Sequence, residues 1–436
     1  RTHPPPAHYI YLDVVPIRGT PASPRIGHKP AFEYAVKMRE FPSDARLDER
    51  LTANRVPRAA VADFGESLAS FHSSLPAVRG IRPAEIASAA LRNVDELAAL
   101  LGDRREIKAL RAWTEQQCVK LAPVLAQRAA EGAHRECHGD LHLQNLLWRG
   151  GKIVAFDALE FDRKLRDIDV VSEIAFLAMD LQAHDRGDLA YELSSRYFET
   201  SGDYGGIDVL PFYLVYRALV RAKVAAIKQA QSAADGHDAE LYLETATALA
   251  TPNTPLLVIT HGFSGSGKTT VTNELVSRLP AIRARSDLER KRLHGLAPSA
   301  RSGSGVGTGL YGAGASEKTY AALAEIADRL LRNGQNAIID AAFLRRDDRL
   351  EFRQAAPAKG ARLGILDCAA PPNELGPPIR ARARRGRDAS EADLEVLERQ
   401  LSTAEPLDRA ERRHVVAVDT KRSIRYAELA ARLRRA

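Results

Sequence analysis

The strongest chemical signal in this sequence is a glycine-rich stretch, "GFSGSGKT" from Gly262 to Thr269, followed by a second threonine, Thr270. It matches the pattern GxxxxGK(S/T) and lies between a hydrophobic run typical of a buried strand and a stretch typical of a helix. Glycines at this spacing let successive backbone N–H groups turn inward around phosphate oxygens, at the positive end of the following helix. The alternative is a flexible Gly/Ser turn, which the strand and helix context disfavours.

We therefore expect this loop to bind ATP, with Mg²⁺ as the second cofactor. Lys268 would reach the β- and γ-phosphates and stabilise charge during catalysis, and Thr269 would hold Mg²⁺. The complete set of expected ATP-binding residues is Gly262, Phe263, Ser264, Gly265, Ser266, Gly267, Lys268, Thr269 and Thr270.

Two aspartates follow later hydrophobic runs that read as strands. Asp340 ends "NAIID", where a carboxylate could hold Mg²⁺ through water, and Asp287 ends "IRARSD" and opens a helix that carries Arg290. In small-molecule kinases built on this kind of loop, the carboxylate of the second strand is well placed to take the proton of the acceptor hydroxyl. We therefore expect Asp287 to be catalytic and Asp340 to be a metal ligand. A bare aspartate at a strand–helix junction can instead be only a helix N-cap.

An arginine cluster lies just before an acidic helix in "RARARRGRDAS". Arginines of this density could form a lid that closes over transferring phosphoryl groups and neutralises developing charge. Arg382 and Arg385 are the members to which we assign catalytic roles. The alternative is a solvated basic helix face.

A second motif, "CHGDLHLQNLLW" from Cys137 to Trp148, places Asp140 five residues before Asn145. This is the separation found in the protein-kinase catalytic loop, in which the aspartate orients the acceptor hydroxyl and the asparagine holds magnesium. Asp157 follows twelve residues after Asn145, where that fold places its principal metal carboxylate. A polar turn could explain Asp140 alone, but it would not predict Asp157. His138 and His142 have no further His/Cys cluster near them in sequence and are expected to be structural.

The elements that must position these residues divide the chain in two. Apolar residues recur at helical spacing over residues 56–128 and again over 169–250, and two apolar runs flank Gly150 and Gly151 in the form of a short hairpin. After the break "ATPNTP", five strand-like runs alternate with helical stretches, which indicates a mainly parallel sheet. The expected strands are Leu256–Thr260, Ile282–Arg285, Ala337–Ile339, Leu363–Leu366 and Val415–Val418. The expected domains are residues 1–250 and 251–436, and "RSGSGVGTGLYGAG" (Arg301 to Gly314) is expected to be a mobile loop.

Composition excludes several classes of protein. Of 436 residues, 45% are hydrophobic and 27% charged, and no apolar run approaches the length of a membrane span, so a soluble, cytoplasmic protein is expected. Its three cysteines form no CxxC pair, which argues against a zinc site or a disulfide framework and favours buried thiols in a reducing compartment. A net charge of +7 allows nucleic acid as a partner without favouring it.

These motifs together resemble a known family. At "CHGDLHLQNLLW" the sequence resembles the aminoglycoside phosphotransferase-like kinases, and the whole chain resembles bacterial bifunctional aminoglycoside phosphotransferase/ATP-binding proteins, in which such a domain precedes a P-loop AAA or zeta-toxin-like kinase domain. The resemblance also rests on "GFSGSGKTT", "RSDLERKRLHG", "IIDAAFLRRDDR" and "RGRDASEADLEVLERQ", and it spans nearly everything from Phe32 onward. It implies a mostly helical protein-kinase-like domain followed by a P-loop domain with a parallel sheet, that is, α+β and α/β folds. It also implies that Asp140 is a catalytic base and that Asn145 and Asp157 are metal ligands.

One departure concerns the start of the chain. A kinase of this fold grips the nucleotide phosphates with an upstream glycine-rich or equivalent loop and a lysine on an early strand, and neither precedes Phe32. We therefore expect one of three explanations for the upstream lobe: it was removed, it is not included in this sequence, or it is missing from the protein. Lys37 in "EYAVKMREF" could be the lysine, but the resemblance places this strand at the junction of the two lobes.

The expected function is transfer of the ATP γ-phosphoryl group to a hydroxyl group of a small molecule. Two alternatives stay open. One is a polynucleotide 5′-hydroxyl kinase, because such enzymes also combine a P-loop with an Asp-x-x-Arg segment like Asp287 to Arg290. The other is a regulatory ATP-binding protein whose first domain is non-catalytic. Neither the acceptor nor the oligomeric state follows from the sequence.

Overall fold

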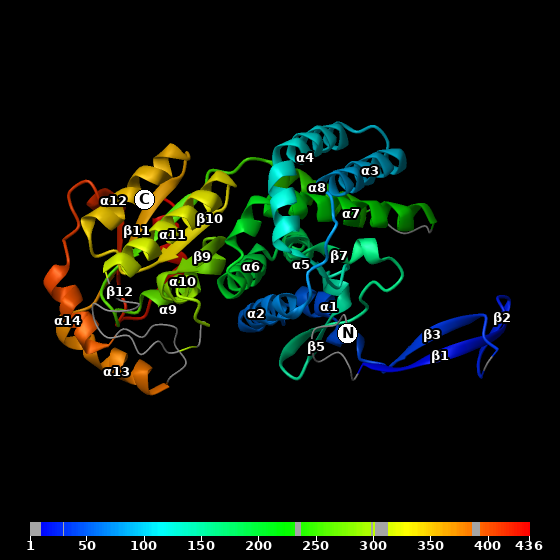
Figure 1. The fold of residues 1–436 in the computed structure, drawn as a ribbon, viewed down its shortest axis with the longest axis horizontal. Helices are drawn as coiled ribbons and strands as arrows, with labels where there is room; N and C mark the ends of the chain where they lie inside the picture. Colours follow the sequence, from blue (N-terminus) through cyan, green and yellow to red (C-terminus); the bar gives the residue numbers. More distant parts are fainter. Residues whose placement is uncertain (1–9, 29, 232–236, 298–299, 301–312, 386–392) are drawn as a thin grey trace.

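The computed structural model describes residues 10–28, 30–231, 237–297, 300, 313–385 and 393–436. In these residues a mainly helical region precedes an α/β region, and the two lie side by side along the longest axis of the molecule (Figure 1). The order of a helical domain and then a parallel α/β domain confirms the predicted fold class. None of the described helices combines the length and apolar character needed to cross a membrane.

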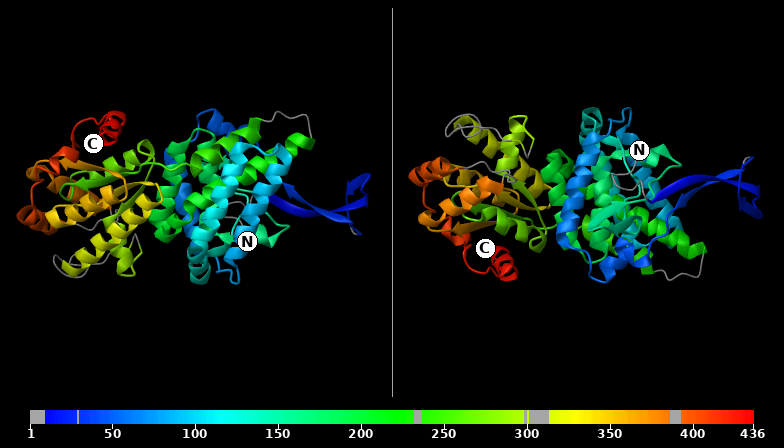
Figure 2. Two further views of the ribbon diagram at one scale, coloured as in Figure 1. Left: turned by 90° about the horizontal axis from the view of Figure 1, so that it is seen from above. Right: turned by 90° about the horizontal axis from the view of Figure 1, so that it is seen from below.

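The chain begins with a three-stranded antiparallel sheet, which the sequence pattern did not indicate apart from its last strand. The strand order is β2-β1-β3, formed by β1 (Tyr11–Thr20), β2 (Ser23–Ile26) and β3 (Glu33–Met38). This sheet projects away from the helical region (Figure 1, Figure 2). Apolar side chains such as Leu12, Val14 and Tyr34 are therefore exposed on it.

The helical region is built around one helix that is buried nearly all round. Helix α5 (Val170–Ala183) exposes little beyond Gln182, which matches a mostly apolar sequence whose acidic residues Glu173 and Asp180 are themselves buried. The surrounding helices bury apolar residues against it or against one another, and α6 also packs against the α/β region. They are α1 (Leu47–Thr52), α2 (Arg58–Ser74), α3 (Pro83–Leu101), α4 (Arg105–Glu131), α6 (Gly187–Ser201), α7 (Leu210–Gln231) and α8 (His237–Ala250).

Two small antiparallel ladders hold the Asp140 motif within this region. Strand β4 (His134–Glu136) precedes it and pairs with β7 (Asp167–Asp169). Strand β5 (Leu146–Arg149) follows it and pairs with β6 (Lys152–Ala155), which confirms the predicted hairpin. Its turn residues have φ values of +54° at Gly150 and +80° at Gly151, as a two-residue type I′ turn requires.

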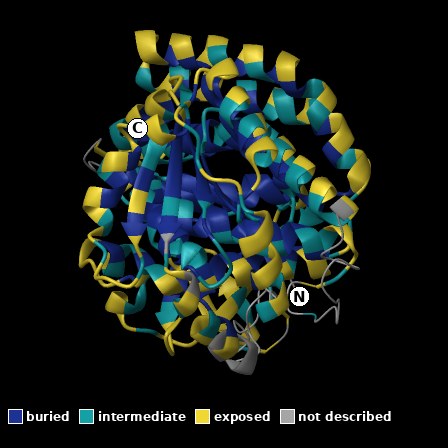
Figure 3. Ribbon diagram, turned by 90° about the vertical axis from the view of Figure 1, so that its left-hand side faces the viewer, coloured by how far each residue is buried: buried dark blue, intermediate teal, exposed yellow. Residues whose placement is uncertain are grey.

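The α/β region contains a five-stranded parallel sheet in the order β12-β11-β8-β10-β9. The five predicted strands are all present, as β8 (Leu256–His261), β9 (Ala281–Arg285), β10 (Asn336–Asp340), β11 (Arg362–Ala369) and β12 (Val415–Asp419). The middle strands are almost wholly buried, as expected for a parallel sheet covered on both faces (Figure 3).

Helices connect and cover these strands. They are α9 (Lys268–Arg278), α10 (Ser286–Leu293), α11 (Ala313–Arg332), α12 (Arg346–Ala358), α13 (Gly376–Arg385), α14 (Leu394–Thr403) and α15 (Tyr426–Leu433). The predicted glycine-rich loop Arg301 to Gly314 lies outside the described residues except for its end. There the prediction was wrong, because Ala313 and Gly314 already belong to α11.

The two regions are in direct contact through helix α6, which packs against the outermost strand β9 and against α9. Along the chain, α8 ends at Ala250 and β8 begins at Leu256. The predicted division into residues 1–250 and 251–436 falls in this connection and stays a prediction.

Candidate active site

The glycine-rich loop joins the buried strand β8 to helix α9. The φ values are +143° at Gly262 and +83° at Gly265, in the region of φ that side chains with a Cβ rarely adopt. A Cβ at Gly262 would lie 2.8 Å from the carbonyl oxygen of Cys368, and one at Gly265 would lie 2.8 Å from that of Leu375. Both positions therefore require glycine, and the resulting tight turn is of the kind whose N–H groups can surround an anion.

Polar groups of the loop bond to the loop itself and to a distant helix. The Nζ of Lys268 donates hydrogen bonds to the carbonyl oxygens of Gly262 (2.8 Å) and Phe263 (2.7 Å). The backbone N–H of Ser264 donates to Oε1 of Gln400 on α14 (2.9 Å). The hydroxyl of Ser266 is buried and has no hydrogen-bond partner among the described residues.

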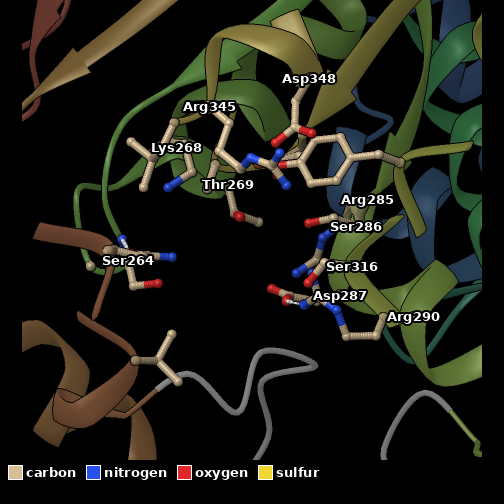
Figure 4. Close-up of a pocket in the computed structure, with 18 of the residues that line it drawn as sticks. Ser264, Lys268, Thr269, Arg285, Ser286, Asp287, Arg290, Ser316, Arg345 and Asp348 are labelled. Atoms are coloured by element: carbon tan, nitrogen blue, oxygen red, sulfur yellow. Dashed lines mark hydrogen bonds and ion pairs between the residues drawn. The ribbon is translucent and has the colours of Figure 1, made fainter. Parts of the chain in front are cut away.

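A cavity of about 640 Å³ lies beside this loop and brings together most of the site residues predicted in the α/β region. Figure 4 shows Ser264 and Lys268 on one side and Asp287 and Arg290 on the other, with Thr269 near the middle. The predicted residues that line the cavity are Ser264, Gly265, Gly267, Lys268, Thr269, Thr270, Asp287 and Asp340. The predicted residues Gly262, Phe263 and Ser266 do not line it and instead shape the turn.

The donor set beside Lys268 fits a magnesium ion. Thr269 contributes a hydroxyl and Asp340 a carboxylate to the same cavity, and oxygen atoms are the ligands that Mg²⁺ prefers. Asp340 is buried at the end of β10, and its Oδ2 accepts a hydrogen bond from the hydroxyl of Thr272 (3.1 Å). This contact with α9 fixes the carboxylate.

Asp287 lies in the first turn of α10, directly after strand β9. Its Oδ1 accepts a hydrogen bond from Nη1 of Arg290, one turn further along the helix (3.2 Å). The N-cap of α10 is Arg285, not Asp287, and the side chain of Arg285 makes no capping hydrogen bond. The alternative in which Asp287 is only an N-cap is therefore wrong, and its carboxylate faces the cavity.

Several cavity residues were missed by the sequence reasoning. Arg345, Asp347 and Asp348 follow strand β10, and Tyr320 comes from α11. Burial raises the pKa of Asp348, although the nearby Arg345 opposes the shift. Burial also raises the pKa of Tyr320 to about 12. The signal that could have identified Arg345 and Asp348 is their place after a predicted parallel strand, because such loops line sites in open α/β sheets.

The arginine cluster is only partly described. Arg382 and Arg385 lie in the last turns of α13, but their side chains, like all of Arg387, lie outside the described residues. Pro378 of the same helix lines the cavity. The catalytic roles of Arg382 and Arg385 stay predictions.

In the predicted site of the helical region, the candidate catalytic and metal-binding side chains Asp140 and Asn145 are hydrogen-bonded to each other. The amide of Asn145 donates to the backbone oxygen (3.0 Å) and to Oδ2 (2.9 Å) of Asp140, and Nε2 of His142 lies 3.3 Å from the same Oδ2. Burial acts to raise the pKa of Asp140. The hydrogen bond and charge of His142 act in the opposite direction, and the pKa of Asp140 lies below its usual value. Asp157 is exposed after strand β6 with φ of +62°, and its N–H donates to the hydroxyl of Tyr11 (2.7 Å).

A buried carboxylate of helix α5 anchors the loop that carries Asp140. Glu173 accepts hydrogen bonds from the backbone N–H groups of His138 (2.7 Å) and Gly139 (2.9 Å). The ring of His138 bonds through Nε2 to the carbonyl oxygen of Phe156 (2.8 Å). These contacts agree with the structural role predicted for His138, and Glu173 itself was not predicted.

Two family comparisons match successive parts of the chain. A phosphotransferase enzyme family matches residues 44–162, and an AAA domain family matches residues 257–407. The first segment contains Asp140, Asn145 and Asp157, and the second contains the glycine-rich loop, Asp287 and Asp340. Together they support a phosphotransferase.

Relatives with similar sequences are found in mycobacteria. The uncharacterized proteins Rv2004c of Mycobacterium tuberculosis and Mb2027c of Mycobacterium bovis are each 28% identical over 377 residues. Each alignment covers 85% of this chain and 75% of the relative.

Comparison with solved structures gives matches over a little more than 40% of this chain. A gluconokinase from Sinorhizobium meliloti 1021 is 21% identical, with a TM-score of 0.30, over 42% of this chain and 94% of its own. Kti12 from Chaetomium thermophilum, in complex with ADP-AlF3, is 15% identical, with a TM-score of 0.33, over 41% of this chain and 98% of its own. In agreement with the predicted resemblance, the chain joins a domain of the phosphotransferase enzyme family to a P-loop AAA domain.

Proposed function

We propose that this chain transfers the γ-phosphoryl group of ATP to a hydroxyl group of a small molecule, in the cavity beside the glycine-rich loop. One observation carries the proposal. A single cavity is lined by Lys268, Thr269 and Asp340 and also by the Asp287–Arg290 pair, which lies across the cavity from Lys268 (Figure 4). Phosphoryl transfer needs this combination, because its catalysis rests on positioning and on charge stabilisation.

The loop side would bind the nucleotide. Backbone N–H groups of the cavity-lining loop residues, Gly265 and Gly267 to Thr270, would donate to the phosphate oxygens. Lys268 would exchange its bonds to loop carbonyl oxygens for bonds to the β- and γ-phosphates. Thr269 and Asp340 would hold Mg²⁺, which when bound neutralises charge on these phosphates.

The opposite side would activate the acceptor. Asp287 accepts the proton of the acceptor hydroxyl, and the oxygen of that hydroxyl bonds to the γ-phosphorus. At the same time the bond between the γ-phosphorus and the bridging oxygen breaks, and ADP leaves with that oxygen. Arg290 holds the Asp287 carboxylate in place for this transfer. Arg382 and Arg385 would stabilise the charge on the transferring group.

For the helical domain we propose a second kinase-like site on the strength of the family resemblance. Asp140 would be its base, and Asn145 and Asp157 would be its metal ligands. The bond between Asn145 and Asp140 would have to open for Asn145 to reach a metal ion.

We place the protein in the cytoplasm, because Cys118, Cys137 and Cys368 are all buried free thiols.

The proposed function is tested by supplying the intact chain and Mg²⁺ with γ-labelled ATP and separate panels of hydroxylated metabolites, aminoglycosides and oligonucleotides. Labelled small-molecule product, absent in Asp287→Asn, supports the proposal. Label transferred only to oligonucleotide 5′ ends, with binding that weakens steeply as salt rises, would instead identify a polynucleotide kinase. Tight ATP binding without any transfer would identify a regulatory ATP-binding protein.

A further inference from the structure

A buried arginine connects the helical domain to the P-loop cavity. Arg283 lies on the outermost strand β9 and is only 3% exposed. Its Nε and Nη2 donate to the two carboxylate oxygens of Glu199 on helix α6, at 2.6 Å and 3.3 Å. The side chain of Glu199 is 2% exposed, so this bidentate pair is almost free of solvent. A pair of this kind is sensitive to the loss of either partner, because the other charge then stays buried and unpaired.

The third guanidinium nitrogen points into the P-loop domain. Nη1 of Arg283 donates to the hydroxyl of Thr272 (3.1 Å) and lies 3.4 Å from the carbonyl oxygen of Thr269. The Thr272 hydroxyl in turn donates to Oδ2 of Asp340 (3.1 Å). The series Glu199, Arg283, Thr272 and Asp340 is therefore a continuous hydrogen-bonded chain from one domain to a proposed metal ligand of the other. We name it the interdomain relay.

We propose that Glu199, a residue of the helical domain, is a positioning residue for the metal site of the P-loop domain. This inference rests on the proposed function, in which Thr269 and Asp340 hold Mg²⁺. Glu199 fixes the guanidinium of Arg283 and neutralises its charge, so that Arg283 supports Thr272 without competing for the carboxylate of Asp340. Without Glu199, a buried cation next to Asp340 would oppose the binding of a divalent cation.

The electrostatics of the pair agree with this role. Burial acts to lower the pKa of Arg283, but the charge of Glu199, and to a smaller extent that of Asp340, raises it above the usual value. Burial acts to raise the pKa of Glu199, and Arg283 brings it below the usual value. Both groups are thus charged, and Asp340 is close enough to act on Arg283.

The same domain interface supplies a matched control. Asp208, after α6, forms ion pairs with Arg329 and with Arg332 (2.9 Å) of α11. It also accepts a hydrogen bond from Asn333 (2.8 Å). Asp208→Asn therefore weakens contacts between the domains without touching the interdomain relay.

The test uses the full chain and Mn²⁺ as a spectroscopic probe for the Mg²⁺ site. Binding of Mn²⁺ in the presence of ADP is measured by electron paramagnetic resonance, and binding of ADP in EDTA by calorimetry. We expect Glu199→Gln to weaken Mn²⁺ binding by roughly 10-fold to 100-fold, as for other residues that orient metal ligands. Its affinity for metal-free ADP and the Mn²⁺ affinity of Asp208→Asn should stay at the wild-type values.

A second pair of variants tests the interdomain relay within the P-loop domain. Thr272→Val removes the hydroxyl that bonds to Asp340 and should weaken Mn²⁺ binding, whereas Thr272→Ser keeps the hydroxyl and should retain it. This pair keeps the inference falsifiable if Glu199→Gln does not fold, because wild-type Mn²⁺ binding in Thr272→Val would break the interdomain relay. Wild-type Mn²⁺ affinity in Glu199→Gln or in Thr272→Val, or an equal loss in Asp208→Asn, would overturn the inference alone. Failure of the wild-type chain to bind Mn²⁺ with ADP would overturn the proposed function as well.

Discussion

Lys268 donates a hydrogen bond of 2.8 Å to the carbonyl oxygen of Gly262, so the first and seventh residues of the glycine-rich loop are tied together. The lysine that is expected to grip the phosphates therefore also bonds to carbonyl oxygens of its own loop. In the proposed function, ATP offers phosphate oxygens to the same ammonium group.

Lys268→Ala is expected to remove most ATP binding or turnover, because a neutral methyl group cannot stabilise the charge of the phosphates. We expect kcat/KM to fall by about 10²-fold to 10³-fold, as for the loss of other charge-stabilising donors. Calorimetry with ATP and steady-state kinetics in an Asp140→Asn background provide the measurement. Wild-type affinity and turnover in that variant would refute the assignment of the loop.

Asp287→Asn is expected to lower kcat by about 10²-fold to 10⁴-fold with little change in the KM for ATP, because the carboxylate acts on the acceptor proton. Asp347→Asn is the matched control. Asp347 lines the same cavity, but its side chain is 84% exposed, and we propose no role for it in phosphoryl transfer. Equal losses in the two variants would mean that general charge in the cavity matters and that Asp287 is not the base.

Arg382→Ala and Arg385→Ala are expected to lower kcat more than they weaken nucleotide binding, because a charge-stabilising group acts most strongly during transfer. If the segment closes as a lid, protease cleavage after Arg382 or Arg385 should slow when ATP and a correct acceptor are both present, and less with ATP alone. Arg422→Ala is a control for loss of an exposed arginine. Cleavage that ignores ligands, with near-normal rates in both variants, would leave only a solvated helix face.

Asp140→Asn is expected to leave most of the ATP turnover of this chain unchanged, because the phosphate-binding residues that we propose lie in the P-loop domain. Turnover with the best acceptor is measured in Asp140→Asn and in Lys268→Ala. A large loss in the first variant together with full activity in the second would transfer the catalytic role to the helical domain.

Arg128→Met is expected to destabilise the helical domain by about 3–5 kcal/mol at neutral pH, because it leaves a buried carboxylate unpaired. Arg128 holds both oxygens of the fully buried Asp169, at 2.7 Å and 2.8 Å. Burial acts to raise the pKa of Asp169, but Arg128 outweighs it and keeps that pKa below its usual value. The pair therefore stabilises the fold above the usual carboxyl pKa, and this contribution is lost as the pH falls through the lowered pKa.

In Arg128→Met the unpaired Asp169 can be protonated at a higher pH, so the difference in stability from wild type should shrink as the solution is acidified from pH 7 to about pH 4. Urea denaturation at several pH values measures it. Arg82→Met, which breaks an exposed pair with Glu85, should not change the unfolding midpoint. A pH-independent difference would show that lost packing, not charge, is responsible.

Local sequence patterns were sufficient to predict the parallel sheet and the loop at its edge. Apolar runs such as Leu256–Thr260 become buried strands. Gly262 and Gly265 of the loop are required because a Cβ at either position would clash with a carbonyl oxygen. The hairpin around Gly150 was equally predictable, because a two-residue turn with positive φ leaves few other solutions. The N-terminal sheet was not predicted, because its exposed apolar residues follow no pattern of one buried face.

Contacts between residues far apart in the chain could not be predicted in this way. Gln400 bonds to the N–H of Ser264 across 136 residues, and Glu199 meets Arg283 across 84. Nothing in the local sequence of either glutamine or glutamate distinguishes it from a solvated helix residue. Their roles appear only when the topology brings α14 to the loop and α6 to strand β9.

The packing of α6 on β9 also bears on whether the two halves of the chain can be separated. The edge of a sheet presents unpaired N–H and C=O groups that invite other strands to add to it. Here the hydroxyl of Ser195 accepts from the backbone N–H of Arg283 (3.0 Å), and that of Tyr204 donates to its carbonyl oxygen (3.3 Å). Side chains of the helical domain thus occupy a position where a neighbouring strand would pair. A P-loop half produced alone would expose these backbone groups and offer the edge of its sheet to other strands.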